Sequence, residues 1–428
     1  MIVGGRDGRL KPAPAAPRVR VGLFGLLGSG NIGNDASMEA ILGYLRSAHP
    51  DAAIDAMCMG SDQVRARYGI DAIPLLWYQK YDKRVTGVPA SALKVLGKGA
   101  DAIRTAAWVR RHDVVIVPGM GILEATLPLH AWGVPYSMFL LTASGRVFGT
   151  KVALISVGAN VVNQRVTRWL FNQVARLAFY RSYRDEQSRD AMRRGMDTAG
   201  DPVYPDLVFS LPSAPAAGDP QIVGVGVMAY YGSNDDRKRA GEIYATYIQN
   251  VESFIRWLLD HGRQVLLFYG DETDEPAIRQ VLADLSEYHS GPESPRLSAV
   301  HATSFAELSR AMSTVGALVG TRFHNVMCAL KLGKPTISIG YAKKNVVMME
   351  DMGLPGYWQY AQSLDVEKLI EQFTKLEGEA DRVRAVLAAR SAEKAELLAR
   401  QFTILDTLLF PARTDQAGTP ASPSSHVG

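Results

Sequence analysis

The chain has 428 residues, of which 47% are apolar and 21% are charged, a composition that excludes collagen-like and low-complexity proteins. Its 47 basic and 43 acidic residues give a net charge of +4 without a run of five or six like charges, which argues against a dedicated nucleic-acid-binding protein. The two cysteines, Cys58 and Cys328, provide no disulfide framework and fit a reducing compartment, so we expect a cytoplasmic location.

Three segments carry little regular patterning. Residues 1–17 lack an apolar core of secretory length and predict a disordered leader rather than a signal peptide. Residues 411–428 are rich in Pro, Thr, Ser and Gly and predict a disordered tail. The stretch Ala125–Gly145 contains no charged residue, but Pro128 and Pro135 interrupt it. We interpret it as a loop and a buried helix; the alternative is a surface that contacts the inner face of the cell membrane.

The first half of the chain alternates predicted strands with predicted helices. It begins with a strand at Val19–Gly25, a polar loop at Gly28–Asp35 and an amphipathic helix at Ala36–Arg46. Further apolar strands follow at Ala53–Cys58, Asp113–Gly119, Lys151–Gly158 and Phe179–Asp185. This alternation predicts a parallel, doubly wound sheet and hence a Rossmann-like domain over residues 18–211.

The same pattern restarts in the second half. Residues 212–220 are rich in Pro and Ala and predict a linker. Residues 221–362 then predict a second Rossmann-like domain, and residues 363–410 predict C-terminal helices. The strands of this domain are expected at Ile222–Val227, Gln264–Tyr269, Ala317–Gly320 and Pro335–Gly340. The predicted fold class is therefore α/β, with two Rossmann-like doubly wound domains that face a cleft.

The most informative segment follows the strand that ends at Gly320. Arg322 and His324 come next, and a helix begins there. Ligands of open α/β sheets bind at the carboxyl ends of strands, and a helix N-terminus favours anions. Arg322 offers a planar set of donors for a carboxylate or phosphate, and His324 can exchange a proton near neutral pH. These features predict a small anionic ligand with Arg322 and His324 at the centre of its site.

Other strand ends supply further candidates. Lys343 or Lys344 follows the next strand and could add a cation, although a solvated lysine pair explains the segment equally well. Arg184 would face the cleft from the first domain, while Asp185 or Ser188 would cap the adjacent helix. We expect Asp206 to order a turn. The eight histidines show no metal-ligand spacing with cysteines or carboxylates, so we predict no metal site.

Two glycine-containing turns could approach a ligand closely. In the loop Gly28–Asp35, Asn31 and Asp35 could contact sugar hydroxyls or position a proton acceptor. In Pro-Gly-Met-Gly, residues 118–121, Gly119 and Gly121 lie at a strand end where backbone can approach a ligand. Neither turn has the spacing of a dinucleotide-binding or Walker motif, so each is weak evidence when taken alone.

Taken together, these motifs resemble the polysaccharide pyruvyl transferase family. The resemblance spans about residue 20 to about residue 355 and rests on seven segments in the family's order. They are Asn-Ile-Gly-Asn-Asp-Ala (31–36), Pro-Gly-Met-Gly (118–121), Tyr-Arg-Asp-Glu-Gln-Ser (183–188), Pro-Asp-Leu-Val-Phe-Ser-Leu (205–211), Gly-Thr-Arg-Phe-His (320–324), Leu-Gly-Lys-Pro (332–335) and Gly-Tyr-Ala-Lys-Lys (340–344). Two segments depart from the family pattern, because Pro118 and Met120 interrupt a glycine run and Asn34 separates Gly33 from Asp35.

The resemblance implies a GT-B-like fold, phosphoenolpyruvate as co-substrate without another cofactor, and a saccharide or lipid-linked saccharide as acceptor. It places donor binding in the second domain and acceptor binding in the first. The donor-binding residues would be Arg184, Arg322, His324 and Lys344; the acceptor-binding residues would be Asn31, Asp35, Gly119 and Gly121; and the catalytic residues would be His324 and Asp35. Two alternatives stay open, a nucleotide-sugar glycosyltransferase on the same architecture and a non-catalytic carbohydrate-binding protein of polysaccharide assembly.

Overall fold

The computed structural model describes residues 18–77, 88–124, 131–212, 217–232, 234–269, 272–288 and 296–410, with the side chains of 88–95, 234–235 and 272 left aside. The predicted leader 1–17 and tail 411–428 lie outside the described residues, as do 125–130 of the uncharged stretch and 213–216 of the predicted linker. Within the described part of the chain, no helix is long and apolar enough to cross a membrane.

The first domain is built on a six-stranded sheet in which every pairing is parallel. The strand order is β3-β2-β1-β4-β5-β6, the doubly wound order in which the direction of winding reverses between β1 and β4. The strands are β1 (Arg20–Gly25), β2 (Ala53–Cys58), β3 (Asp71–Pro74), β4 (Val114–Pro118), β5 (Lys151–Val157) and β6 (Tyr180–Tyr183). The central strands are buried on both faces, because helices cover the sheet on each side.

The first five helices of this domain connect successive strands, and the sixth follows the last strand of the sheet. They are α1 (Ile32–Ala48), α2 (Ser61–Tyr68), α3 (Val88–Val109), α4 (Val134–Phe148), α5 (Arg165–Leu177) and α6 (Glu186–Met192). α1 begins four residues earlier than the sequence pattern predicted, because the Asn31 side chain accepts hydrogen bonds from the backbone N–H groups of Gly33 and Asn34. The predicted loop therefore ends at Asn31, and Asp35 lies in the first turn of α1.

The second domain repeats this architecture in the order β12-β11-β10-β7-β8-β9, again with parallel pairings throughout. Its strands are β7 (Asp219–Gly226), β8 (Gln264–Phe268), β9 (Leu297–Val300), β10 (Val315–Gly320), β11 (Thr336–Gly340) and β12 (Trp358–Tyr360). Its connecting helices are α7 (Ala240–Asp260), α8 (Glu275–Asp284), α9 (Phe305–Thr314), α10 (Phe323–Lys331) and α11 (Lys343–Asp351). β7 begins at Asp219, inside the predicted linker 212–220.

The prediction of two Rossmann-like doubly wound domains is confirmed by these two sheets. The sequence pattern did not predict β3, β9 and β12, which are three or four residues long and lie toward the outside of their sheets. Such short strands carry too few apolar positions to show a period of two.

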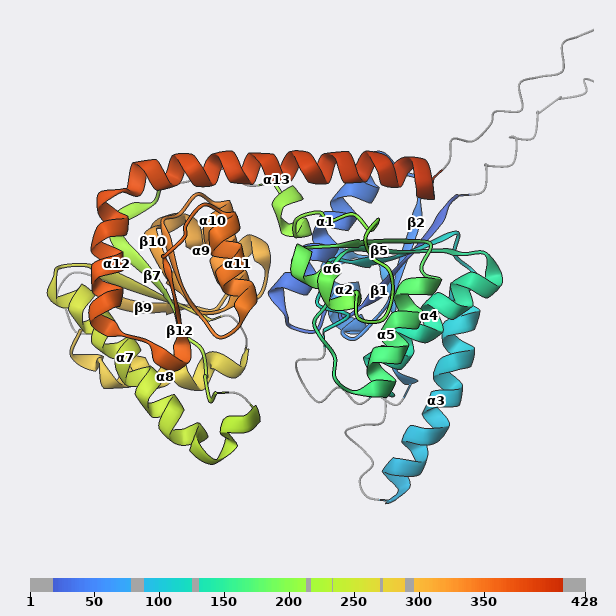
Figure 1. The fold of residues 1–428 in the computed structure, drawn as a ribbon, viewed down its shortest axis with the longest axis horizontal. Coiled ribbons are helices and arrows are strands. Elements are labelled where there is room, and N and C mark those ends of the chain that lie inside the picture. The colour runs from blue at the N-terminus through green and yellow to red at the C-terminus, as the bar shows by residue number, and fades with distance from the viewer. Residues whose placement is uncertain are drawn as a thin grey trace, which may run out of the picture.

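Two helices close the described chain, α12 (Val366–Gly378) and α13 (Ala380–Leu409). Figure 1 shows α13 running across the top of the molecule from the second domain to the first. It is anchored on the first domain by Gln401, whose side chain is fully buried. The Gln401 Oε1 accepts a hydrogen bond from Ser156 Oγ (3.2 Å), and its Nε2 donates to Ser182 Oγ (2.8 Å). The ring of Phe402 stacks on Tyr44, with centroids 4.6 Å apart.

The Gln401 contacts predict a specific stability loss. Gln401→Leu should lower the free energy of unfolding by about 1–3 kcal/mol, because it leaves the buried Ser156 and Ser182 hydroxyls without their partner. Urea unfolding followed by circular dichroism measures this change. Thr403→Ala removes an exposed hydroxyl two residues away on the same helix and should leave the midpoint nearly unchanged. Equal midpoints for the two variants would show that Gln401 is not an anchor.

Candidate active site

The centre of the candidate site is the turn from β10 to α10. Arg322 has extended backbone and is the N-cap residue of α10, so its side chain leaves the chain just before the first helical turn. Its guanidinium donates two hydrogen bonds to the buried carboxylate of Asp274, one from Nε to Oδ2 at 2.9 Å and one from Nη2 to Oδ1. This bidentate pair fixes the plane of the Arg322 guanidinium at the carboxyl edge of the second sheet.

His324 of the second domain contacts the first domain. Its imidazole lies against the backbone of Gly33 in α1 so closely that a Cβ atom on Gly33 would lie 1.8 Å from His324 Nε2. Burial, together with the positive charges of Lys344, Arg184 and Arg322, lowers the pKa of His324 to about 3. In the ligand-free protein His324 is therefore neutral at physiological pH.

Arg184 and Lys344 approach one carboxylate from opposite domains. Arg184 follows β6 in the first domain and donates from Nη2 to Oε1 of Glu124, while Lys344 of α11 places Nζ 3.7 Å from Glu124 Oε2. Both cations lie over the ring of Phe323, at 5.5 Å for Arg184 and 5.2 Å for Lys344. This arrangement concentrates two positive charges beside the start of α10, where the helix dipole also favours an anion.

The environment of Arg184 keeps it charged. Burial alone would lower the pKa of Arg184, but the carboxylates of Glu124, Asp206 and Asp185 outweigh this effect and raise it. Asp185 and Asp206 also have structural roles, as the sequence predicted. Asp185 caps α6 by accepting a hydrogen bond from Ser188 N (2.6 Å), and Asp206 orders a turn by accepting one from Val208 N (3.1 Å).

The four predicted donor-binding residues thus lie together. The charges of Arg184, Arg322 and Lys344 are close enough to His324 to lower its pKa. Sequence reasoning missed Glu124 and Asp274, the carboxylates that hold these cations. Glu124 had a detectable signal, because it follows β4 by a few residues and therefore lies at the same sheet edge as Arg184. Among the described residues, no group of three or more His, Cys, Asp or Glu side chains is arranged to hold a metal ion.

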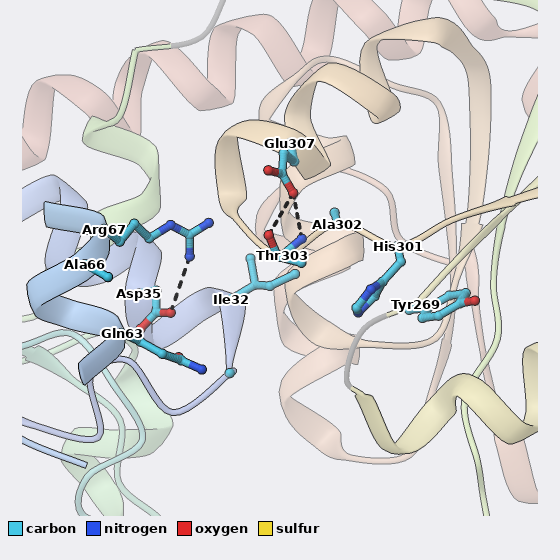
Figure 2. A pocket seen from close by; sticks show the side chains of 11 residues that line it. Ile32, Asp35, Gln63, Ala66, Arg67, Tyr269, His301, Ala302, Thr303 and Glu307 are labelled. Atoms are coloured by element: carbon cyan, nitrogen blue, oxygen red, sulfur yellow. Dashed lines mark hydrogen bonds and ion pairs between the residues drawn. The ribbon is translucent and has the colours of Figure 1, made fainter. Parts of the chain in front are cut away.

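The predicted acceptor-binding residues lie in different surroundings. Asp35 lines a cavity of about 490 Å³ whose walls come from both domains (Figure 2). Asp35 is buried, accepts a hydrogen bond from Gly28 N (2.7 Å) and lies 3.9 Å from Arg67 Nη1. Burial raises the pKa of Asp35, while the Gly28 hydrogen bond and Arg67 act in the opposite direction. The opposite wall carries the rings of Tyr269 and His301, 4.9 Å apart.

Asn31, Gly119 and Gly121 do not belong to the lining of this cavity. Asn31 uses its side-chain oxygen to cap α1. Gly119 is buried, and its carbonyl oxygen accepts a hydrogen bond from Ser37 Oγ (2.5 Å), which ties β4 to α1. Gly121 makes room for Glu124, since a Cβ there would lie 2.7 Å from Glu124 Cδ. Gly119 therefore helps to position α1, and Gly121 leaves space for the side chain of Glu124.

A pair of glycines in α1 provides a matched test of the domain contact. Gly33→Ala should displace the His324 imidazole and reduce catalytic activity by about tenfold or more, because a small misplacement of a reacting group slows the reaction strongly. Gly43→Ala makes the same change in the same helix, where a Cβ meets nothing within 4 Å, and should leave activity intact. Steady-state kinetics of both variants measures the difference, and equal activities would show that the Gly33–His324 contact is unimportant.

Comparison with known proteins identifies the family. The model of the family described as polysaccharide pyruvyl transferase matches residues 31–343. The chain belongs to the polysaccharide pyruvyl transferase family. Membership supports a transferase that modifies polysaccharides. A search of curated proteins found no significant match.

Several solved structures with a similar architecture are UDP-N-acetylglucosamine 2-epimerases. A UDP-N-acetylglucosamine 2-epimerase has 12% sequence identity and a TM-score of 0.58, with 96% of this chain and 100% of that chain covered. A putative UDP-N-acetylglucosamine 2-epimerase from Listeria monocytogenes has 12% identity and a TM-score of 0.57, with 93% and 98% covered. The UDP-GlcNAc 2-epimerase from Neisseria meningitidis, bound to UDP-GlcNAc, has 11% identity and a TM-score of 0.53, with 89% and 99% covered. These similarities show a GT-B-type fold.

Proposed function

We propose that this enzyme transfers the enolpyruvyl group of phosphoenolpyruvate to two hydroxyl groups of a saccharide and forms a pyruvate ketal. The observation that carries the proposal is the convergence of Arg184, Arg322 and Lys344 around His324. Phosphoenolpyruvate carries a carboxylate and a phosphate, and its binding requires several positive charges in a partly desolvated place. Arg184 and Lys344 supply charge from different domains, so the donor would bind between the domains and hold them together.

The chemistry requires a proton at the methylene carbon of the donor. Protonation of that carbon leaves an oxocarbenium-like centre at the neighbouring carbon, to which the first saccharide hydroxyl adds. The bond from that carbon to the phosphate oxygen then breaks, and the second hydroxyl closes the ketal ring. Of the two hydroxyl protons released, one replaces the proton given to the methylene carbon and the other leaves with phosphate.

His324 is the proposed acid in this sequence. It is neutral in the free enzyme because burial and three cations disfavour its protonated form. An anionic donor would offset the field of Arg184, Arg322 and Lys344 and raise the pKa of His324. The histidine would then take up a proton when the donor is bound, so the acid would form only in the donor complex.

The acceptor is proposed to bind in the cavity beside Asp35. The volume of about 490 Å³ is in the range of small-molecule sites, and the cavity has polar groups on both walls. The rings of Tyr269 and His301 offer flat surfaces to a sugar, and Asp35 and Arg67 offer hydrogen-bonding groups on the opposite wall (Figure 2). Because burial raises the pKa of Asp35, this carboxylate is suited to accept a proton from an acceptor hydroxyl.

The test combines binding and turnover. The purified protein is titrated with phosphoenolpyruvate and, separately, with UDP-N-acetylglucosamine, and is then incubated with phosphoenolpyruvate and saccharides that carry a free diol. We expect phosphoenolpyruvate to bind, inorganic phosphate to be released, and the acceptor mass to increase by one pyruvate less one water. Binding of the nucleotide sugar alone would favour a glycosyltransferase. Saccharide binding without release of phosphate from phosphoenolpyruvate, whichever acceptor is added, would favour a non-catalytic protein.

A further inference from the structure

The first domain contains a long stretch without acidic residues. Between Glu124 and Asp185 the sequence has neither Asp nor Glu, although the whole chain has nearly equal numbers of acidic and basic residues. The stretch nevertheless carries basic residues, which are Arg146, Lys151, Arg165, Arg168, Arg176, Arg181 and Arg184. It includes α4 and α5, which pack against each other and follow α3 along one side of the first domain (Figure 1). The helices α4 and α5 therefore carry basic side chains and no acidic ones.

The same side exposes large apolar side chains. Two of them are tryptophans, Trp132 just before α4 and Trp169 in α5, with exposed fractions of 59% and 53%. The other exposed apolar residues of the two helices and their flanks are Val147, Phe148, Val161, Val166 and Phe179. The aromatic rings form two pairs, Trp132 with Tyr136 at 5.5 Å and Phe139 with Trp169 at 5.7 Å between ring centroids. We call this set, together with the arginines of α4 and α5, the α4–α5 face.

The arginines of the α4–α5 face are exposed to solvent. In the part of the chain that the structure describes, no carboxylate forms an ion pair with Arg146, Arg165, Arg168 or Arg176. Some exposed arginines elsewhere on the chain have carboxylate partners, such as Asp190 for Arg193 and Glu396 for Arg400. Their charge is thus available to an anionic partner outside the chain.

We infer that the α4–α5 face binds the surface of an anionic lipid bilayer. Exposed tryptophan rings partition to the boundary between headgroups and acyl chains, and each nearby arginine gains from the negative surface potential. Exposed aromatic side chains on the same helices as exposed arginines are typical of a surface that interacts with a membrane. Since no helix of the described residues is both long and apolar enough to span a membrane, the contact would be peripheral.

One end of the α4–α5 face lies at the same edge of the first sheet as the candidate active site. α4 and α5 start near the carboxyl ends of β4 and β5, and Glu124 and Arg184 lie at the carboxyl ends of β4 and β6. Because all strands of the sheet are parallel, these positions share one edge. Trp132, Val166 and Trp169 lie at that end of their helices. Membrane binding through this face would therefore hold the inter-domain site close to the bilayer surface.

The experiment measures vesicle binding by the full chain. Vesicles of phosphatidylglycerol and phosphatidylcholine in equal parts are compared with vesicles of phosphatidylcholine alone in a co-sedimentation assay without substrates. We expect binding to the anionic vesicles that weakens when salt is raised from about 0.1 M to about 0.5 M, because salt screens the arginines. The double variants Arg165→Glu/Arg168→Glu and Trp132→Ser/Trp169→Ser should each reduce the partition coefficient by about tenfold or more.

The control places the same kinds of change elsewhere. Tyr231→Ser/Arg193→Glu removes an exposed ring and reverses an exposed charge outside the α4–α5 face and should bind like the wild type. Thermal unfolding of each variant shows that the fold is kept. The inference is overturned if the wild-type chain does not bind anionic vesicles, or if both α4–α5 variants bind as well as the control, which would place the contact elsewhere. These assays contain no phosphoenolpyruvate, so their outcome is independent of the proposed transfer reaction.

Discussion

Replacement of Arg184 by methionine is expected to reduce kcat/KM for phosphoenolpyruvate by about a thousandfold or more. The change removes a charge-assisted hydrogen-bond donor from a partly desolvated site. This loss alone lowers the rate of catalysis by about 100- to 1000-fold. It also leaves Glu124 with Lys344 as its remaining close cation, so the carboxylate would repel an anionic donor. Initial rates of phosphate release at varied phosphoenolpyruvate concentration measure the loss.

Two further variants make the Arg184 test specific. Arg181→Met makes the same change three residues earlier in β6, where the guanidinium pairs with Asp201, and should leave kcat/KM within about threefold of the wild type. Arg184→Lys keeps the charge but loses the planar set of donors, so we expect an intermediate loss. A wild-type kcat/KM in Arg184→Met would remove Arg184 from the donor site.

Replacement of His324 by glutamine is expected to lower kcat by about 100- to 10,000-fold, the usual contribution of a positioned proton donor. The structure also predicts a proton coupling. The pKa of His324 is about 3 in the free enzyme, so a donor that raises this pKa above the ambient pH must bring a proton with it. Phosphoenolpyruvate should therefore bind more weakly as the pH rises through the raised pKa.

Calorimetry measures this coupling directly. Titration with phosphoenolpyruvate in two buffers of different ionisation enthalpy gives the number of protons taken up, which should be about one greater for the wild type than for His324→Gln. His261→Gln alters a histidine at the end of α7, away from the site, and should retain the wild-type uptake. Equal proton uptake in the wild type and His324→Gln would assign His324 to donor binding alone.

The sequence predicted the strand-to-helix switch at Gly320 well, because consecutive apolar residues before it and a helical period after it are local signals. It placed Arg322, His324, Arg184 and Lys344 at strand ends, and parallel topology was sufficient to bring them to facing edges. Their partners were harder to predict. Asp274 holds Arg322 across 48 residues, and such a pairing depends on how the chain folds back.

The contact between His324 and Gly33 was also beyond sequence reasoning. It depends on how closely the two domains approach, and no local pattern encodes that distance. The path of α13 shows the same limit. Its periodicity predicted a helix, but a stripe of apolar residues does not specify which domain it covers. The short strands β3, β9 and β12 were missed because they owe their conformation to neighbouring strands.

The path of α13 has a consequence for biosynthesis. When the strands of the first sheet have been synthesised, the first domain still lacks part of its packing. The hydroxyls of Ser156 and Ser182 form hydrogen bonds with Gln401, which belongs to the last helix of the described chain. At ordinary elongation rates, the roughly 200 intervening residues take about 10–40 s to synthesise. During that interval the surface around Tyr44 has no cover, so a fragment that stops after the first domain would be a substrate for chaperones and proteases.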